Sequence, residues 1–271
     1  MRYVTIGHIC QDRLPHGWMF GGAATYSARM AHALGCQVQV LTSLRSDVDV
    51  RPALLDIEVV RLPSDHTTTF ENIYTKQGRQ QTLHAVAERL TPDRFPATPT
   101  ADIVHLAPIA QEVDLAWLAC FPGALIGVTP QGWLRQWDAQ GRISPIGWAE
   151  AGQVLPRADA VIISIEDVAH QEDLVQQWAA QAKILAVTRG AHGCTVHQNG
   201  GVTAVPTQAV EAVDATGAGD IFAASFLVRL RECDDPIAAA HFASCLASQS
   251  ITRRGLESIP TPSEIDQCRK V

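Results

Sequence analysis

The chain has 271 residues, of which 46% are hydrophobic and 18% are charged, a composition typical of a globular protein with a substantial core. Its formal net charge of -7, without any run of lysine and arginine, argues against a nucleic-acid partner, because a phosphate backbone requires a basic face. No apolar run reaches the roughly 18 residues that a membrane-spanning helix needs, so we expect no membrane partner either.

The cysteines and the N-terminal segment bear on the cellular compartment. The seven cysteines are scattered and form no Cys-x-x-Cys pair. This pattern favours reduced thiols over a disulfide framework or a zinc site. Residues 1–7 contain no apolar run of signal-peptide length. We therefore expect a cytoplasmic protein with free thiols.

Short apolar runs rich in β-branched residues recur along the chain, and longer helical patterns follow most of them. Such runs predict buried strands of a parallel sheet, at Tyr3–Ile6, Val38–Thr42, Ile103–Leu106, Leu125–Val128, Ala160–Ile163 and Ile184–Val187. Helices are predicted at Ala23–Leu34, at Glu166–Gln181, after Asp220, and from about Pro236 to Ser250. Gly35 is well placed to end the first helix. The alternation predicts an α/β fold with helices around a mostly parallel sheet.

Residues 66–87 depart from this pattern. The segments before and after Gly78 alternate between polar and apolar residues, as the strands of an antiparallel hairpin do. Antiparallel strands outside a parallel core suggest a lid or an extension of the sheet edge. The stretch Thr91–Thr100, rich in proline and threonine, is interpreted as a loop that returns to the main sheet, not as a domain linker. We therefore expect one domain over residues 1–271, with small β-lid segments at about 12–20 and 66–87.

The most informative motif is Asp214–Asp220, which runs directly into an apolar helical segment. Gly217, Ala218 and Gly219 carry little or no side chain, so backbone N–H groups at the start of the helix are open to an anion such as phosphate. Asp220 beside an anion site is electrostatically unfavourable unless it takes a proton from a nucleophile. Alternatively, Asp220 simply caps the first helical turn. The motif alone leaves both interpretations open.

Ligands of open α/β sheets bind beyond the carboxyl ends of the strands, so the loops that follow the predicted strands form a candidate rim. These loops are 7–12, 129–135, 164–167 and 188–193. Trp133 and Arg135 in the second loop either touch a substrate or, in the case of Trp133, pack in the core. No Walker motif and no Gly-x-Gly-x-x-Gly motif occurs, so a phosphate site must rest on the Gly217 turn.

The segment Asp214–Asp220 closely resembles the nucleotide-side signature of ribokinase-like sugar kinases, the phosphofructokinase B type family. Gly21–Ala28, continuing through Ala31, Leu34 and Gly35, resembles the N-terminal substrate signature of that family. Segments 187–190, 250–255 and 258–260 are also similar. The resemblance covers essentially the whole chain. It implies a ribokinase-like three-layer fold with a small β-lid, and ATP-dependent transfer of a phosphoryl group to a hydroxyl of a sugar or sugar alcohol.

The resemblance assigns catalytic and nucleotide-binding roles. It makes Asp220 the general base and makes Gly217, Ala218 and Gly219 an anion hole for the transferred phosphoryl group, which suits a reaction that depends on positioning and charge stabilisation. The ATP-binding positions that it implies are Thr188, Gly190, Gly193, Gly217 and Gly219. For Thr188 and Gly190, a plain turn between strand and helix is an equally good explanation.

The resemblance also assigns the acceptor side. Asp12 matches an acidic residue that binds substrate hydroxyls, although a solvated loop aspartate would look the same. Gly21 and Gly22 would let the backbone approach the substrate, or they only open the helix at Ala23. Relatives usually carry asparagine where this chain has Tyr26, which argues against a ribose pocket and favours an inositol-like polyol. A nucleoside acceptor is the alternative within the same fold.

Two metal sites are implied by the resemblance. The Asn-x-x-Glu segment of the family is here Ser164-Ile165-Glu166-Asp167, so Asp167 or Glu166 would hold magnesium through water. Relatives hold a potassium ion at positions that correspond to Asp214, Thr216, Ser250, Arg253, Gly255 and Ser258. ATP and magnesium are therefore the expected cofactors, with potassium as a further candidate. The altered magnesium segment keeps open a rival, a catalytically silent sugar- or nucleotide-binding protein. We expect a monomer or a homodimer.

Overall fold

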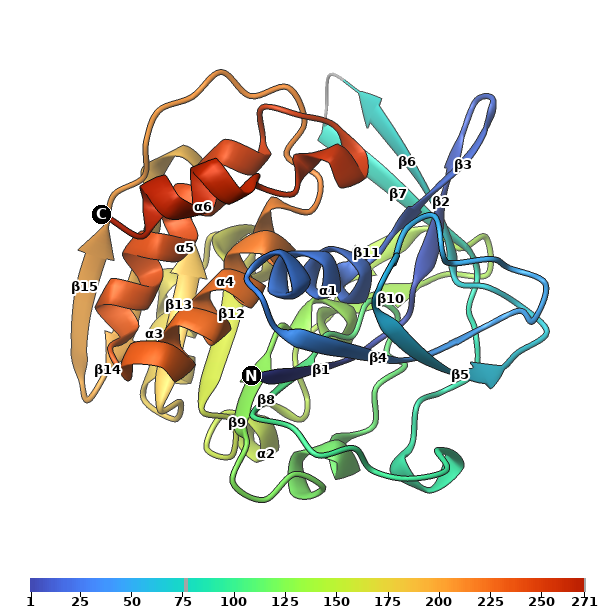
Figure 1. The fold of residues 1–271 in the computed structure, drawn as a ribbon, viewed down its shortest axis with the longest axis horizontal. Coiled ribbons are helices and arrows are strands. Elements are labelled where there is room, and N and C mark those ends of the chain that lie inside the picture. Colours follow the sequence, from blue (N-terminus) through green and yellow to red (C-terminus); the bar gives the residue numbers. More distant parts are fainter. Residues whose placement is uncertain (76–77, 271) are drawn as a thin grey trace.

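The centre of the molecule is a nine-stranded sheet, in the part of the chain that the computed structural model describes, residues 1–75 and 78–270 (Figure 1). Its strand order is β15-β14-β13-β12-β9-β8-β1-β4-β5. The bounds are β1 Arg2–Ile6, β4 Gln37–Leu44, β5 Glu58–Pro63, β8 Ile103–Leu106, β9 Leu125–Val128, β12 Ala160–Ser164, β13 Ile184–Thr188, β14 Cys194–Gln198 and β15 Gly201–Val205. Neighbouring strands from β5 to β13 pair in parallel, whereas β14 pairs antiparallel with β13 and β15.

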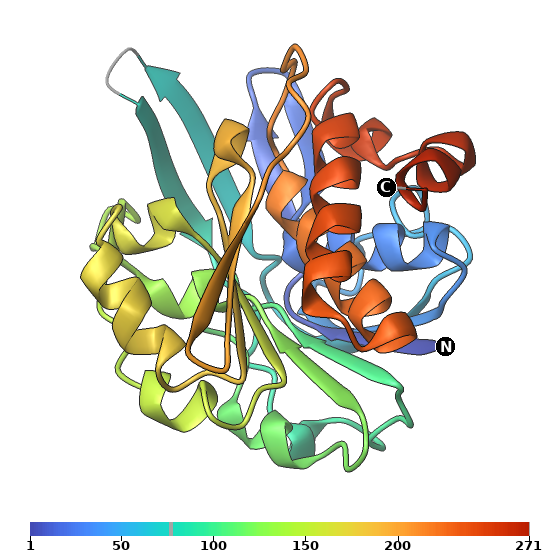
Figure 2. The same ribbon diagram turned by 90° about the vertical axis from the view of Figure 1, so that its left-hand side faces the viewer.

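Helices cover both faces of this sheet, which gives the molecule three layers (Figure 2). One face carries α1 Ala23–Ala33, α4 Ala218–Cys233 and α5 Pro236–Ser250, with α6 Pro262–Cys268 beside them; the other carries α2 Ala151–Val154 and α3 Glu172–Ala179. Successive residues of a strand point to opposite faces, so Tyr3 joins the core under α1 and α4 while Val4 and Ile6 join the opposite core. Both faces are buried, which explains why the strands are continuous apolar runs.

A second, four-stranded sheet stands at one end of the molecule (Figure 1). Its order is β3-β2-β6-β7, with β2 Cys10–Leu14, β3 Gly17–Gly21, β6 Thr69–Thr75 and β7 Gly78–Ala85. The pairs β2–β3 and β6–β7 are antiparallel, which confirms the hairpin predicted around Gly78, and β2 runs parallel to β6. We call these four strands the lid sheet. Residues 76–77 lie outside the described residues.

A short hairpin of β10 Arg135–Trp137 and β11 Ile143–Pro145 lies next to the lid sheet. It follows directly on a 3-10 helix, η3 Pro130–Leu134, after the end of β9. A bridge between Arg142 and Thr82 of β7 joins this hairpin to the lid sheet. Five more 3-10 helices are found in the described residues: η1 Pro92–Arg94, η2 Leu115–Ala119, η4 Ile165–Val168, η5 Gly190–His192 and η6 Gly255–Ser258.

The six predicted strands are confirmed, and the helix predictions hold except at two starts. The helix predicted at Glu166–Gln181 begins six residues later, at Glu172, because the Asp167 carboxylate accepts a hydrogen bond from the Ser164 N–H and closes η4 as a separate turn. Ala169 then adopts a positive φ of 49°, which ends that turn. Helix α4 begins at Ala218, so Asp220 lies inside its first turn and not ahead of it.

The prediction of reduced thiols is wrong for one pair of cysteines. Cys245 of α5 and Cys268 of α6 form a disulfide. The two residues are 23 positions apart and have no motif spacing, so only the packing of α6 against α5 reveals the pair. The other five cysteines are free thiols. No helix among the described residues is long and apolar enough to cross a membrane.

Candidate active site

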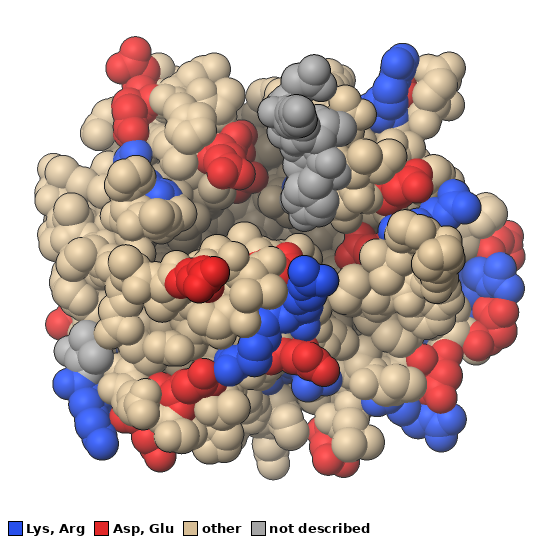
Figure 3. Space-filling view, turned by 90° about the horizontal axis from the view of Figure 1, so that it is seen from above, with Lys and Arg blue, Asp and Glu red and all other residues tan. Residues whose placement is uncertain are grey.

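A cavity of about 620 Å³ lies between the lid sheet, the carboxyl ends of the central strands and the start of α4. Predicted acceptor-binding, ATP-binding and catalytic residues all line it, including Asp12 from β2, Thr188 from β13 and Asp220 from α4. Figure 3 looks onto this end of the molecule and shows a hollow near its middle, with charged side chains around it. The structure therefore brings together residues that are far apart in the sequence. Trp18 and Phe20 line a different hollow, on the other side of the lid sheet.

The Gly217 turn has the geometry of an anion-binding helix start. Gly217 is the N-cap of α4 with φ 80°, a left-handed conformation that favours glycine. A Cβ atom there would lie 2.4 Å from Cδ1 of Tyr26, so the aromatic ring also requires glycine at this position. Gly219 also lines the cavity, and a Cβ atom added there would have no neighbour within 4 Å. The positive end of the 16-residue helix α4 thus faces the cavity.

A carboxylate outside the helix holds this turn in place. Asp214 Oδ1 accepts a hydrogen bond of 2.9 Å from the Thr216 N–H, and Asp214 Oδ2 accepts one of 3.4 Å from the Gly255 N–H. The N–H groups of Val213 and Asp214 both donate to the carbonyl of Ile251. The turn is therefore tied to the loop that follows α5, and its amides are fixed before any ligand arrives.

Asp12 lies across the cavity from this turn, on β2 of the lid sheet. A Cβ atom at Gly21, on the paired strand β3, would lie 2.2 Å from Asp12 Oδ2, so Gly21 leaves room for this carboxylate. Gly22 has φ 92° and a built Cβ 2.7 Å from the His8 carbonyl, so it permits the entry into α1. Both glycines are thus explained by their own neighbours, and a direct contact of either with substrate stays a prediction.

Asn72 and Gln81 extend the polar wall around Asp12, and sequence reasoning missed both. Asn72 Nδ2 donates to Asp12 Oδ1 over 3.2 Å, and Gln81 Nε2 donates to Asn72 Oδ1 over 2.9 Å. Both side chains line the cavity, on β6 and β7. The alternation of residues 66–87 is the signal that would have placed them on one face of the predicted hairpin.

Tyr26 of α1 forms part of the cavity wall between the two carboxylates. Its side chain is buried, and burial raises its pKa, with further increases from the negative charges of Asp220 and Asp12. The phenol is therefore neutral, and its hydroxyl has no hydrogen-bond partner among the described residues. Tyr26, which replaces the usual asparagine and was predicted to reshape the acceptor pocket, thus also lies against the Gly217 turn, because its ring packs on Gly217.

The predicted nucleotide side occupies the far end of the cavity. Thr188, Gly190 and Gly193 line it, beside Thr207 and Ser248. Thr188 Oγ1 donates to the carbonyl of Ile163 in the neighbouring strand, so its hydroxyl helps to join β13 to β12. Gly193 has φ 80°, and a Cβ atom there would lie 2.1 Å from the Val205 carbonyl, so it permits the close approach of β15.

Only one of the two predicted magnesium residues reaches the cavity. Glu166 lines it, whereas Asp167 is partly buried and its carboxylate caps η4. Burial is the largest effect on the Asp167 carboxyl and raises its pKa, although the Ser164 N–H and Arg135 oppose that shift. No group of three or more metal-binding side chains occurs among the described residues. This arrangement fits a metal that enters with phosphate oxygens and water as ligands, with Glu166 in its outer shell.

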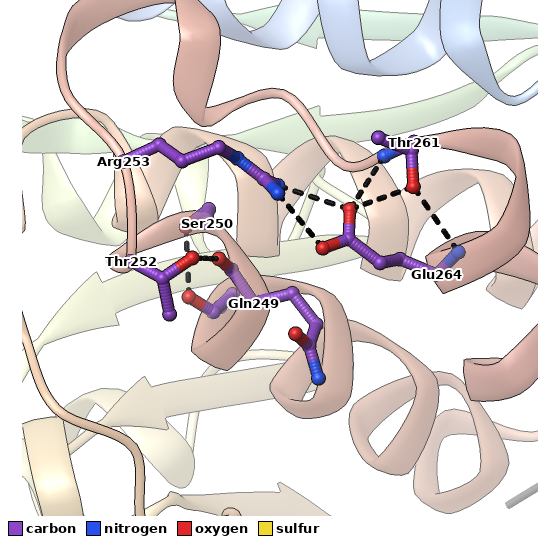
Figure 4. A network of polar contacts seen from close by, with 7 residues as sticks. Gln249, Ser250, Thr252, Arg253, Thr261 and Glu264 are labelled. Atoms are coloured by element: carbon purple, nitrogen blue, oxygen red, sulfur yellow. Dashed lines mark hydrogen bonds and ion pairs between the residues drawn. The ribbon is translucent and has the colours of Figure 1, made fainter.

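The residues of the predicted potassium site do lie together at the Gly217 turn, with one exception. Asp214 and Gly255 are hydrogen bonded, and Ser258 carries a buried hydroxyl that has no partner within the described chain. The Arg253 guanidinium instead binds both oxygens of Glu264 in α6, over 2.8 and 3.0 Å (Figure 4). Its side chain holds α6 in place, so only the backbone of Arg253 is available to a cation.

Arg135, at the start of β10, also lines the cavity, next to Gln131 of η3. Trp133 from the same loop is buried, stacks on Trp148 at a centroid distance of 5.9 Å, and donates from Nε1 to the Val113 carbonyl. Of the two interpretations of this loop, packing therefore holds for Trp133.

A family model described as pfkB family carbohydrate kinase matches residues 149–263. The chain is 28% identical over 247 residues to a cytidine kinase from Thermococcus kodakarensis, covering 83% of this chain and 86% of that protein. It is 26% identical over 225 residues to an ATP-dependent ribose-1-phosphate kinase from Halopiger xanaduensis, covering 80% of this chain and 73% of the relative.

Solved structures match over nearly the whole chain. A pyrophosphate-dependent kinase in the ribokinase family, complexed with a pyrophosphate analogue and myo-inositol, has a TM-score of 0.80 at 21% identity and covers 98% of this chain and 99% of its own. An Arabidopsis thaliana ribokinase complexed with ribose and ATP has a TM-score of 0.74 at 18% identity, with coverages of 99% and 98%. These matches confirm the predicted ribokinase-like fold.

Proposed function

We propose that this chain, which matches a pfkB family carbohydrate kinase model over residues 149–263, transfers the γ-phosphoryl group of ATP to a hydroxyl of a small sugar or polyol. Its relatives include proteins named cytidine kinase and fructokinase. The observation that carries the proposal is the shared cavity. It holds Asp220 and the Gly217–Gly219 amides on one side and Asp12 on the other. A proton acceptor, an anion site and a hydroxyl-binding carboxylate are what the transfer requires.

The reaction follows from these positions. Asp12 accepts hydrogen bonds from acceptor hydroxyls and orients the substrate. Asp220 takes the proton of the reacting hydroxyl as its oxygen forms a bond to the γ-phosphorus, while the bond from that phosphorus to the β–γ bridging oxygen breaks and ADP leaves with the electron pair. The amides of Gly217, Ala218 and Gly219 donate to the oxygens on which charge accumulates. They need no reorganisation, because Asp214 already fixes the turn.

The donor end of the cavity supports ATP as the donor. Thr188, Gly190 and Gly193 would contact the nucleotide, with Gly217 and Gly219 at its phosphates. Glu166 would hold magnesium through water, and bound magnesium supplies charge neutralisation on the phosphates. Asp214, Thr216, Ser250, Gly255 and Ser258 form the candidate potassium site beside the turn, to which Arg253 would contribute its backbone alone.

For the acceptor we favour an inositol-like polyol. Asp12, Asn72 and Gln81 present a row of polar groups, which suits a ring that carries several hydroxyls. The structural neighbour crystallised with myo-inositol supports this choice. A nucleoside is the second candidate, because the cytidine kinase aligns with 83% of the chain. The lid sheet, within the single domain of residues 1–271, would close over either acceptor.

The test is a panel of sugars, polyols and nucleosides in a coupled assay of ADP release. We expect one class of acceptor to stimulate ATP consumption, with polyols ahead of nucleosides. If no acceptor stimulates ADP release while a sugar still raises the melting temperature, the protein is a silent binder and the proposed function is wrong. Stimulation by nucleosides alone would keep the kinase and exclude the polyol.

A further inference from the structure

The charges that line the cavity are unevenly divided. Among the described lining residues, Asp12, Glu166 and Asp220 carry carboxylates, and Arg135 carries the one basic side chain. A phosphoryl group in transfer bears negative charge on its outer oxygens. The amides of the Gly217 turn offset part of that charge, and among the described lining residues Arg135 is the side chain that carries a full positive charge.

The fold brings Arg135 to the same edge of the sheet as the start of α4. Arg135 follows η3 at the carboxyl end of β9. Helix α4 lies directly on β9, since a Cβ atom at Gly127 would be only 2.3 Å from Cδ1 of Leu227. Because the helix crosses this strand so closely, the loop that leaves the strand end and the first turn of α4 border one cavity.

The buried thiol of Cys10 lines the same cavity and is influenced by these charges. Burial raises the pKa of Cys10 most, and the negative charges of Asp12 and Asp220 raise it further. The positive charge of Arg135 acts on the same thiol and lowers its pKa. Arg135 therefore lies within electrostatic reach of the position shared by the acceptor-binding carboxylate and the proposed base.

The backbone of Arg135 is also held firmly. It pairs with Pro145 in the β10–β11 hairpin, and its carbonyl accepts a hydrogen bond from Gln111 Nε2. These contacts fix the point from which the side chain of Arg135 reaches the cavity.

We propose that Arg135 is a catalytic residue that binds the non-bridging oxygens of the phosphoryl group during transfer, together with the amides of the Gly217 turn. This inference rests on the proposed function. The guanidinium stays protonated and makes or breaks no covalent bond; its planar donors suit two phosphate oxygens at once. The negative charge on the phosphoryl oxygens is least shielded while the group passes from donor to acceptor. Arg135 therefore acts on the rate of transfer more than on the affinity for either substrate.

The experiment measures kcat and KM for ATP, and for the acceptor that gives the highest rate in the panel, in wild type and in Arg135→Gln. We expect kcat to fall at least about a hundredfold, with both KM values within about threefold of wild type. Arg135→Lys restores part of the rate, because it keeps the charge without the bidentate geometry. Arg142→Gln is the matched control, because Arg142 is exposed on the same hairpin and pairs with Asp138. We expect this variant to retain the wild-type kcat.

Three outcomes overturn the inference without touching the proposed function. A kcat for Arg135→Gln within about threefold of wild type would show that Arg135 does not contact the phosphoryl group. A rise in the acceptor KM with unchanged kcat would make Arg135 a binder of the acceptor. Loss of the melting-temperature shift caused by ATP, with no change of kcat at saturation, would make it a binder of the donor. If instead wild type releases no ADP with any acceptor, the proposed function itself fails and the inference with it.

Discussion

Gly217 shows how one residue can serve both folding and chemistry. Its left-handed φ of 80° starts α4 with the amides facing the cavity, and the ring of Tyr26 fills the space that a side chain would need. The glycine was recognised in the sequence as part of an anion-binding turn. That Tyr26 requires it as well is visible only in the packing of α1 against α4.

Gly217→Ala is therefore expected to reduce the free energy of unfolding by about 2 kcal/mol or more, from the unfavourable φ and the clash with Tyr26 together. Urea denaturation measures this loss. Gly219→Ala is the matched control, because nothing lies within 4 Å of its built Cβ, and its unfolding free energy stays close to that of wild type. Equal stability of the two variants would contradict the role given to Tyr26.

Asp12 and its partners mark the limit of sequence reasoning at the residue scale. The role of Asp12 was implied by the resemblance to the kinase family, but Asn72 and Gln81 belong to no recognised motif. They reach Asp12 only because β6 pairs with both β2 and β7. Arg135 was predicted to lie on the rim because it follows a predicted strand. That it is the one basic residue among the described lining residues depends on which other side chains face the cavity, and the sequence does not show this.

At the scale of elements, α6 is held by two different links. Arg253 binds Glu264 of α6, which also accepts hydrogen bonds from the N–H and Oγ1 of Thr261. Cys268 joins the same helix to α5. Helix α5 contributes Ser244, Ala247 and Ser248 to the cavity, so these links also brace the donor side.

The Arg253 pair makes part of the stability depend on pH. Hydrogen bonding to Arg253 lowers the pKa of Glu264 below 4.5, so the carboxylate stabilises the folded state above that pH, and the contribution is lost as the pH falls through the lower folded value. We expect Glu264→Gln to lower the melting temperature at pH 7, with a smaller difference from wild type below the folded pKa. Melting curves between neutral and acid pH measure this. A difference that does not shrink in acid would contradict the assignment.

The disulfide predicts sensitivity to redox conditions. It closes a loop of 23 residues, which by chain entropy corresponds to about 3 kcal/mol of stabilisation. Cys268→Ser should therefore melt below oxidised wild type, and dithiothreitol should bring wild type close to the variant. Cys233→Ser serves as the control, since Cys233 is an exposed free thiol. If dithiothreitol does not change the melting temperature of wild type, the disulfide does not form in solution.

For the whole molecule, the strands buried on both faces were the easiest elements to predict. β1, β8, β9, β12 and β13 are short apolar runs because helices cover the sheet on both sides. β15 was missed for the opposite reason: it lies at the sheet edge, and four of its five residues are exposed, so hydrophobicity does not mark it. The Cys245–Cys268 bond was missed because the proximity of α5 and α6 is a property of the fold.

The architecture also explains why the sequence predicts the phosphate end of the site better than the acceptor end. The phosphate end is contiguous, from Asp214 to Asp220, and one helix start builds it. The acceptor end is assembled from β2, β6, β7 and the loop after β9, which are distant in the chain. A motif can describe the first, whereas the second emerges only when the lid sheet meets the central sheet.

The role of Asp220 as general base is tested most directly by ADP release of Asp220→Asn with the best acceptor of the panel. We expect a rate at least about a hundredfold below wild type, with the ATP-induced shift in melting temperature retained, because a general base is removed while the anion turn remains. Asp234→Asn, at the exposed far end of α4, keeps the wild-type rate. Near-full activity of Asp220→Asn would contradict the role of Asp220 and the mechanism built on it.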